Sequence, residues 1–335
     1  MKKSRPSIRR MRPSFVERAR CADALPPSEG FPEWEVPVDY NKETLKIVDT
    51  DVVIRAVIAE IQDRMHHQAV VTNSVTVNEL VTRDLAVLQE EKVQAQFQEA
   101  FSENAEHLGD GGHLIVPINL YAWVEDKENN KLENLFGHTF FLIVFDDETQ
   151  YDFVVQFVDG NGYVSEWHDP VAEMIKQTFH RLKISFVHDT SDVDINLSES
   201  STALRYLRNI GITDPYIDGG SCAYLAYIYL ADFLCTRGQR MSKGHGVRLV
   251  QGLLVSEADF NTKKLTAWQE AIILAYKGAC TLRLFRLIKK HFPTDAARRN
   301  AGWPRGIEFP DPDAIETVWV RKVFEKGVTK LVRLH

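Results

Sequence analysis

Cysteine is scarce in this chain, and long apolar runs are absent from it. The 335 residues include four cysteines, none of them in a CxxC pair, so neither a disulfide framework nor a zinc-ribbon ligand set is expected. The most apolar stretches, 223–231 and 271–284, are too short or too interrupted by charge to cross a bilayer. The N-terminus also lacks the apolar segment of a secretory signal. We therefore expect no membrane contact and an intracellular reducing compartment: the cytoplasm, the nucleus or a virion.

Acidic side chains are almost missing from the first 20 residues. This segment carries eight Lys or Arg and one Glu, a net charge of +7, whereas the remaining 315 residues carry −14. Such an arm is typical of tails that dock on nucleic acid or another acidic partner, and equally of a solvated tail. The acidic body would repel phosphate. Together with its prolines, this composition predicts a disordered tail over residues 1–40.

The rest of the sequence has the composition of a packed globular protein, 44% apolar and 26% charged, and its length suggests about two domains. Periodicity near 3.6 predicts helices over 43–66 and 76–104, the second capped by Thr76 or Asn78. Short β-branched and aromatic runs predict strands. The expected strands are 113–120, 139–145, 153–158 and 183–187, with a helix over 170–182 between the last two, further helices over 202–209 and 266–291, a possible strand over 247–255 and a hairpin over 317–334.

This order predicts an α+β fold in which a mixed sheet is flanked by helices. We divide the chain into four parts. They are the tail (1–40), a helical extension (41–106), a core (107–238) and a C-terminal α+β extension (239–335).

Cys222 stands where a helix is expected to begin. It follows Gly220 and Ser221 and precedes a very apolar segment that runs to about residue 234. The dipole of a helix favours a thiolate at its N-terminus and so lowers the pKa of such a thiol. Glycine would let a substrate backbone approach closely and would leave N–H groups for an oxyanion. A cysteine at such a position is also a common small core residue, so Cys222 needs a base beside it to be a nucleophile.

His138 and Asp159 are the candidates for that base and for the acid that orients it. His138 is expected to open the strand 139–145, and Asp159 ends the strand 153–158. The polar turn between these strands predicts a β-hairpin, which brings the two positions side by side. A cysteine activated by a histidine that a carboxylate holds is the general triad arrangement. His168, by contrast, is interpreted as a turn residue.

The order histidine, aspartate, cysteine, with the cysteine heading a helix, resembles the superfamily of ubiquitin-like-protein (SUMO) proteases and adenovirus-type maturation proteases. The resemblance covers about 110–235 and depends on LIVPIN (114–119), GHTFFLIV (137–144), FVDG (157–160) and GGSC (219–222). It implies a papain-like or adenain-like core with Cys222 as nucleophile, His138 as base and Asp159 as orienting acid. It also implies a protein substrate, a ubiquitin-like conjugate or a viral polyprotein, cut at a peptide or isopeptide bond without a metal or cofactor.

The chain differs from that family at its motif positions. Thr139 replaces the usual Trp, and no Gln occurs in residues 214–221 to serve as oxyanion donor. Asn119, or backbone N–H groups near Gly220 and Ser221, are the candidates for that role.

These differences leave two alternatives open, a catalytically inactive interaction protein on the same fold and an acyltransferase of the bacterial effector type. A papain-type order, in which His245 would follow Cys222, is disfavoured because the separation of 23 residues is far shorter than in papain-like chains.

Overall fold

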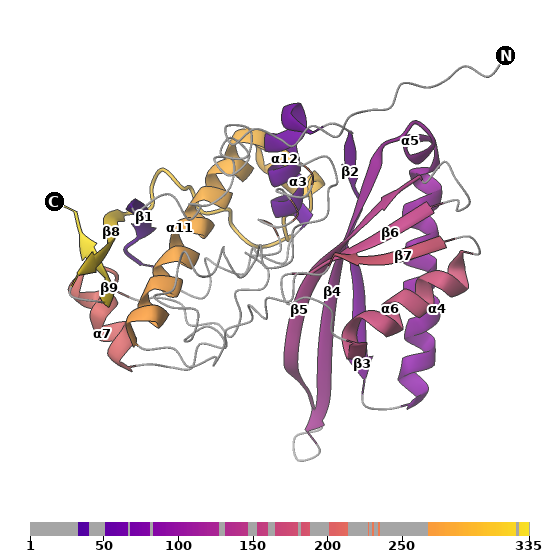
Figure 1. The fold of residues 1–335 in the computed structure, drawn as a ribbon, viewed down its shortest axis with the longest axis horizontal. Coiled ribbons are helices and arrows are strands. Elements are labelled where there is room, and N and C mark those ends of the chain that lie inside the picture. Colours follow the sequence, from indigo (N-terminus) through magenta and orange to yellow (C-terminus); the bar gives the residue numbers. More distant parts are fainter. Residues whose placement is uncertain are drawn as a thin grey trace.

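Two sheets and the helices around them make up the described part of the protein (Figure 1). The computed structural model describes residues 33–39, 51–65, 68–80, 83–126, 131–146, 153–159, 165–179, 182–187, 201–213, 267–325 and 328–334, and the single positions 227, 230 and 234. The strands are β1 (Glu33–Pro37), β2 (Ala69–Val71), β3 (Val75–Leu80), β4 (His113–Asp126), β5 (Lys131–Phe145), β6 (Phe153–Val158), β7 (Leu182–Val187), β8 (Thr317–Glu325) and β9 (Val328–Arg333). The helices are α3 (Asp51–Ile61), the 3₁₀ turn η1 (Gln62–Arg64), α4 (Arg83–Glu103), α5 (Ala105–Gly109), α6 (Ser165–Thr178), α7 (Ser201–Asn209), α11 (Ala267–His291) and α12 (Asp295–Asn300).

The larger sheet is mixed and contains six described strands in the order β2-β4-β5-β6-β7, with β3 also on β4. The strands β4, β5 and β6 form an antiparallel meander. Both β2 and β3 run parallel to β4, and β7 runs parallel to β6. A parallel neighbour requires a crossover, which α6 supplies between β6 and β7. The predicted class, α+β with a mixed sheet flanked by helices, is confirmed.

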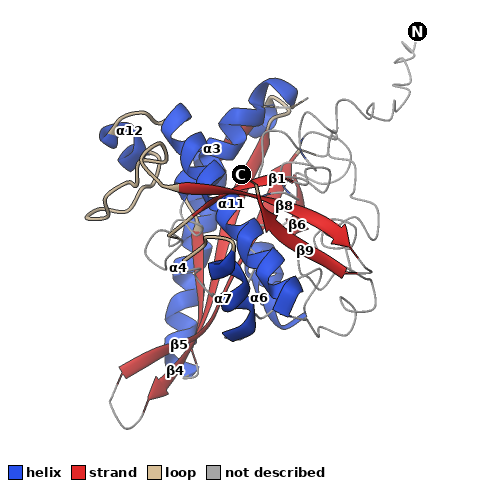
Figure 2. Ribbon diagram, turned by 90° about the vertical axis from the view of Figure 1, so that its left-hand side faces the viewer, coloured by secondary structure: helices blue, strands red, loops and turns tan. Residues whose placement is uncertain are grey.

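Helices cover both faces of this sheet (Figures 1 and 2). Successive side chains of a strand point to opposite faces. On β5, Phe140 and Leu142 join a core with α4 and α6, whereas Phe141 and Ile143 join a second core with α3 and α11. A strand buried on both faces has to be apolar throughout, which explains the unbroken FFLIVF of β5. Neighbouring residues of β5 therefore belong to different environments.

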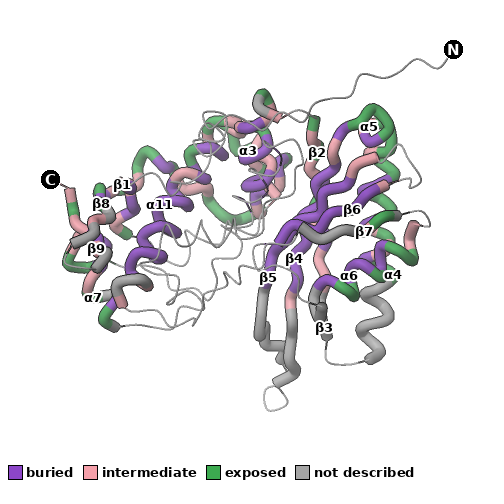
Figure 3. The backbone as a smooth tube through the Cα atoms, viewed as in Figure 1, coloured by how far each residue is buried: buried purple, intermediate pink, exposed green. Residues whose placement is uncertain are grey.

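A small antiparallel sheet, in the order β1-β8-β9, extends the second core. Trp34 of β1 is buried and packs edge-on against Tyr276 of α11, with ring centroids 5.7 Å apart. Every residue from 271 to 280 of α11 is buried (Figure 3). The predicted terminal hairpin is confirmed as β8 and β9. The prediction of a disordered tail over 1–40 is wrong for Glu33–Pro37, because alternate residues of this segment face α11 while its backbone pairs with β8.

The segment expected to begin the second helix is a strand. Residues 75–80 form β3 on the edge of β4, so Thr76 and Asn78 are strand residues and cap no helix. The β-branched run Val75-Thr76-Val77 favours this extended conformation, and the helix α4 begins only at Arg83. The stretch 41–106, predicted as a helical extension, thus contributes two strands, β2 and β3, to the larger sheet.

The other expected elements agree more closely with the structure. The helices over 202–209 and 266–291 correspond to α7 and α11, and the strand over 183–187 corresponds to β7. The helix predicted to start at Pro170 begins earlier, at Ser165. The predicted strand over 247–255 lies outside the described residues. Among the helices that the structure describes, none combines the length and the apolar character needed to span a membrane.

Candidate active site

His138 was predicted to open the strand 139–145. In the structure it lies inside β5. The hairpin of β4 and β5 continues beyond the end of β6 (Figure 1), so β5 runs back to Lys131. Pairing between β5 and β6 starts where Phe141 faces Val158. Asp159, the next residue after β6, therefore comes opposite Phe140, and His138 is its diagonal neighbour on the same face. The register of the hairpin thus brings His138 and Asp159 to one place, where β6 ends.

The two side chains are in direct contact there. Nε2 of His138 lies 2.7 Å from Oδ2 of Asp159, and the side chains are 0% and 3% exposed. The side-by-side placement expected from the hairpin is what the structure has. A buried carboxylate against an imidazole nitrogen fixes both the orientation and the tautomer of the ring.

A second histidine, His168 of α6, reaches the same oxygen. Its Nε2 lies 2.8 Å from Oδ2 of Asp159, and its side chain is 1% exposed. His168 was expected in a turn, but α6 begins three residues before it. Val171, Ala172 and Ile175 of α6 are buried, so His168 lies on the inner side of the helix at three- to four-residue spacing from them. That spacing is the signal in the sequence that could have revealed it.

The rings of β5 and β6 enclose this second imidazole. Phe140 packs edge-on against His168 with ring centroids 4.9 Å apart, and Phe157 does so at 5.8 Å. Phe140 also lies 6.1 Å from the ring of His138. The site is therefore one carboxylate and two imidazoles in an aromatic setting, at the junction of β5, β6 and α6.

The carboxyl group of Asp159 is held in its charged form. Burial disfavours the charge, but the contacts with His138 and His168 outweigh that effect, and the pKa of Asp159 is lowered to about 2. A carboxylate only accepts hydrogen bonds, so both imidazoles donate Nε2–H to Oδ2. In a neutral His138 this leaves Nδ1 as the basic nitrogen of the ring, which is the atom that a proton acceptor needs.

Asn119, a candidate oxyanion donor, faces the other side of the sheet. It lies opposite Thr139, and its Oδ1 accepts a hydrogen bond from Thr139 Oγ1 at 3.1 Å. Both residues are buried. Because side chains alternate along β5, Thr139 and Asn119 point away from the face that carries His138. The structure therefore does not bring Asn119 together with the His138–Asp159 pair.

Cys222, Gly220, Ser221 and His245 lie outside the described residues, so their predicted roles remain predictions. Three positions of the segment after Cys222 are described, Tyr227, Leu230 and Leu234, and all are helical and buried in the second core. The ring of Tyr227 lies 5.5 Å from that of Phe141. The apolar segment that follows Cys222 therefore contributes Tyr227, Leu230 and Leu234 to the core.

The cysteine that the structure does describe, Cys280 of α11, is a core residue. Burial raises the pKa of its thiol well above the ordinary value, which keeps it protonated. Within the described part of the chain, no group of three His, Cys, Asp or Glu side chains is arranged to hold a metal ion. The cluster around Asp159 is thus a set of hydrogen bonds between a carboxylate and two imidazoles.

No protein-family model matches the chain, and no curated protein matches it at a significant level of similarity.

Proposed function

We propose that this protein is a cysteine peptidase in which Cys222 is the nucleophile, His138 the base and Asp159 the group that orients the base. The observation that carries the proposal is the buried contact of 2.7 Å between His138 Nε2 and Asp159 Oδ2 at the end of β6. A carboxylate in this position fixes the imidazole tautomer and stabilises the imidazolium that forms during the reaction. The proposed core is of the papain-like or adenain-like kind.

The steps assign each proton to an atom. His138 Nδ1 would take the proton of the Cys222 thiol, and the thiolate would attack the carbonyl carbon of a peptide or isopeptide bond. The imidazolium would then return the proton to the leaving amine, and water would hydrolyse the acyl-enzyme. Asp159, with a pKa of about 2, stays ionised throughout.

The sheet limits how the thiol can reach its base. Tyr227, five residues after Cys222, packs against Phe141 on the face opposite to His138. A thiol at the start of that helix would therefore have to meet His138 around the end of the sheet, where β6 has stopped, and not across a face. An active protein requires the loop before the helix to cross at this point.

The burial of the three polar side chains favours one alternative, a catalytically inactive interaction protein on the same fold. His138, Asp159 and His168 expose between 0% and 3% of their side chains. A buried network of this kind can fasten α6 to the sheet without any chemistry, since buried hydrogen bonds between side chains help to fix a unique core.

The rate at which each cysteine reacts with iodoacetamide separates the two functions. A triad predicts that Cys222 at pH 6.5 is labelled at least about tenfold faster than Cys235, because a histidine partner lowers the pKa of a thiol. His138→Ala should remove this difference. Equal, slow labelling of Cys222 and Cys235, unchanged by His138→Ala, would leave the inactive protein as the better description.

The same experiment contains its own controls. Cys280 is fully buried, so its labelling reports whether a variant has unfolded. His291→Ala is the control for loss of an imidazole, because His291 binds Glu60 and belongs to no part of the proposed triad. It should leave the reactivity of Cys222 unchanged.

A further inference from the structure

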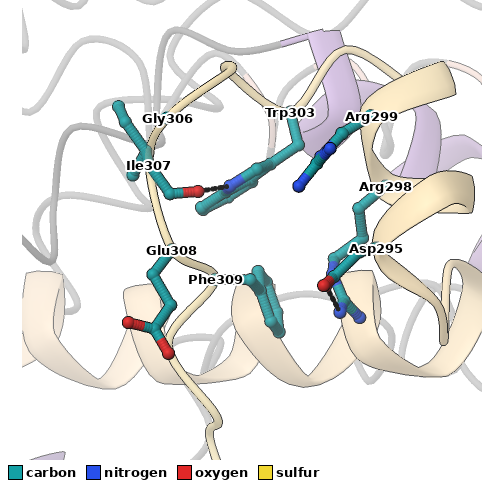
Figure 4. A pocket seen from close by; sticks show the side chains of 8 residues that line it. All are labelled: Asp295, Arg298, Arg299, Trp303, Gly306, Ile307, Glu308 and Phe309. Atoms are coloured by element: carbon teal, nitrogen blue, oxygen red, sulfur yellow. Dashed lines mark hydrogen bonds and ion pairs between the residues drawn. The ribbon is translucent and has the colours of Figure 1, made fainter.

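A separate cavity of about 300 Å³ lies beside α12, formed by residues that the candidate active site does not use (Figure 4). Trp303 and Phe309 form its apolar walls and Ile307, a 44% exposed side chain, its rim. This volume is at the lower end of the range of small-ligand sites. The lining also includes four charged residues, Asp295, Arg298, Arg299 and Glu308.

The aromatic walls are held in place by contacts of their own. Trp303 Nε1 donates a hydrogen bond of 2.8 Å to the carbonyl oxygen of Ile307, which closes the loop between them. The ring of Phe309 packs edge-on against Trp303 at 5.0 Å and against Phe285 of α11 at 5.7 Å. The cavity is therefore formed before any ligand arrives, which reduces the entropic cost of binding.

One of the two arginines at the cavity has a structural task. Arg298 donates to the carbonyl oxygens of Phe292 and Pro293, forms an ion pair with Asp295 and lies 4.4 Å above the ring of Phe309. Its guanidinium fastens the end of α11 to α12. A ligand would find this charge already compensated.

The other arginine has no such task. Neither Arg299 nor Glu308 forms a side-chain hydrogen bond or ion pair with another residue in the described ranges. Figure 4 shows the guanidinium of Arg299 beside the ring of Trp303, while Glu308 lies on the opposite loop. A guanidinium next to an aromatic wall offers a planar fork of donors for a carboxylate and an apolar surface for the group that carries it.

We propose that this cavity binds a carboxylate attached to an aromatic or branched aliphatic group. Arg299 would hold the carboxylate, and Trp303, Phe309 and Ile307 would enclose the apolar group. Two sources have this chemistry, a free organic acid and an acidic residue beside an apolar one in a peptide. The proposal does not depend on the peptidase assignment, because it shares no residue with it.

The indole N–H of Trp303 gives a direct reading of this site. The chain has six tryptophans, and the ¹H–¹⁵N signal that disappears in Trp303→Phe identifies the one in the cavity. We titrate two pairs of compounds into the whole chain. The first pair is phenylacetate and its neutral counterpart 2-phenylethanol, and the second is a capped Phe-Asp dipeptide and its neutral Phe-Asn counterpart. We expect saturable movement of this signal with the acids, and about tenfold weaker binding of the neutral counterparts.

Variants then test the assigned roles. Arg299→Gln should weaken binding of the acids about tenfold and leave the neutral compounds unaffected. The matched control is Arg305→Gln, an exposed arginine of the same loop that does not line the cavity. Ile307→Ala should weaken all four compounds by a few fold and serves if Trp303→Phe fails to fold.

Movement with the dipeptide alone would indicate a protein partner, and movement with phenylacetate alone a free acid; either supports the proposal. It is overturned if no compound moves the Trp303 signal at about 10 mM, a concentration that detects even millimolar affinity. It is equally overturned if the acids and their neutral counterparts bind alike, or if Arg299→Gln has no effect.

Discussion

His168 donates a hydrogen bond to Asp159 across 2.8 Å, and it does so at the oxygen that His138 also uses. The contact joins the first turns of α6 to the residue that follows β6. It gives Asp159 two donors in a place where a buried carboxylate needs them. Whatever the chemistry of His138, the position of its partner carboxylate therefore depends on His168.

Replacing Asp159 by Asn should reduce the loss of unfolding free energy that the protein undergoes in acid. The pKa of Asp159 is about 2 in the folded protein, below the ordinary 3.8. A carboxyl group whose pKa is lowered by folding stabilises the folded state at pH values above its ordinary pKa. This contribution is lost as the pH falls from about 4 to about 2. It amounts to about 2 kcal/mol. Urea unfolding at pH 5 and pH 2.5 measures it as a difference between wild type and Asp159→Asn.

Wild type has to be compared with Asp159→Asn because other carboxyl groups, those of Glu35, Glu60 and Asp311, also have lowered pKa values. Their contribution to the stability of the protein is lost in acid as well. Asp63→Asn serves as a control, since Asp63 is exposed. If Asp159→Asn loses as much stability as wild type between the two pH values, Asp159 is not the buried anion described above.

His168→Phe tests the second imidazole while keeping an aromatic ring between Phe140 and Phe157. The variant removes one donor from a buried carboxylate, which typically costs about 1–3 kcal/mol. A purely packing role predicts no change in pH dependence. Loss of the hydrogen bond predicts a raised pKa of Asp159 and therefore a smaller loss of stability between pH 5 and pH 2.5. His168→Gln, which restores a donor, should recover part of the wild-type pH profile.

The sequence was sufficient for the His138–Asp159 pair and insufficient for His168, for a physical reason. Two strands joined by a short turn have a register that the apolar pattern restricts, so positions at their ends can be matched from the sequence alone. The docking of α6 on that hairpin depends on packing between elements, which leaves no local pattern beyond the buried spacing of the helix. The strands β1 and β3 were missed for a related reason. Both are short strands that pair with partners far from them in the chain.

Cys280 should not react with thiol reagents in the folded protein. Burial raises the pKa of its thiol and shields it from reagent. In a variant in which Cys21, Cys222 and Cys235 are replaced by Ser, labelling at pH 8 should occur only as fast as the protein opens, and low concentrations of urea should accelerate it. Rapid labelling without urea would mean that α11 is more accessible than its burial indicates. Such a result would also remove Cys280 as the folding control for Cys222.

Gly302→Ala should destabilise the junction between α12 and α3 strongly. Gly302 has a φ of +108°, and such a backbone conformation costs a side-chain-bearing residue about 1–3 kcal/mol. A Cβ added there would also lie 2.8 Å from Cβ of Asp51 and 3.3 Å from the backbone nitrogen of Val52. Asp51 is held in turn, because its carboxylate accepts a hydrogen bond from the backbone N–H of Ser74.

The matched control is Gly111→Ala. Gly111 has a φ of +79° and no atom within 4 Å of the added Cβ. It therefore carries the conformational cost alone. Thermal unfolding should show a clearly larger loss for Gly302→Ala than for Gly111→Ala, and equal losses would mean that Asp51 and α3 can move away from Gly302 at little cost.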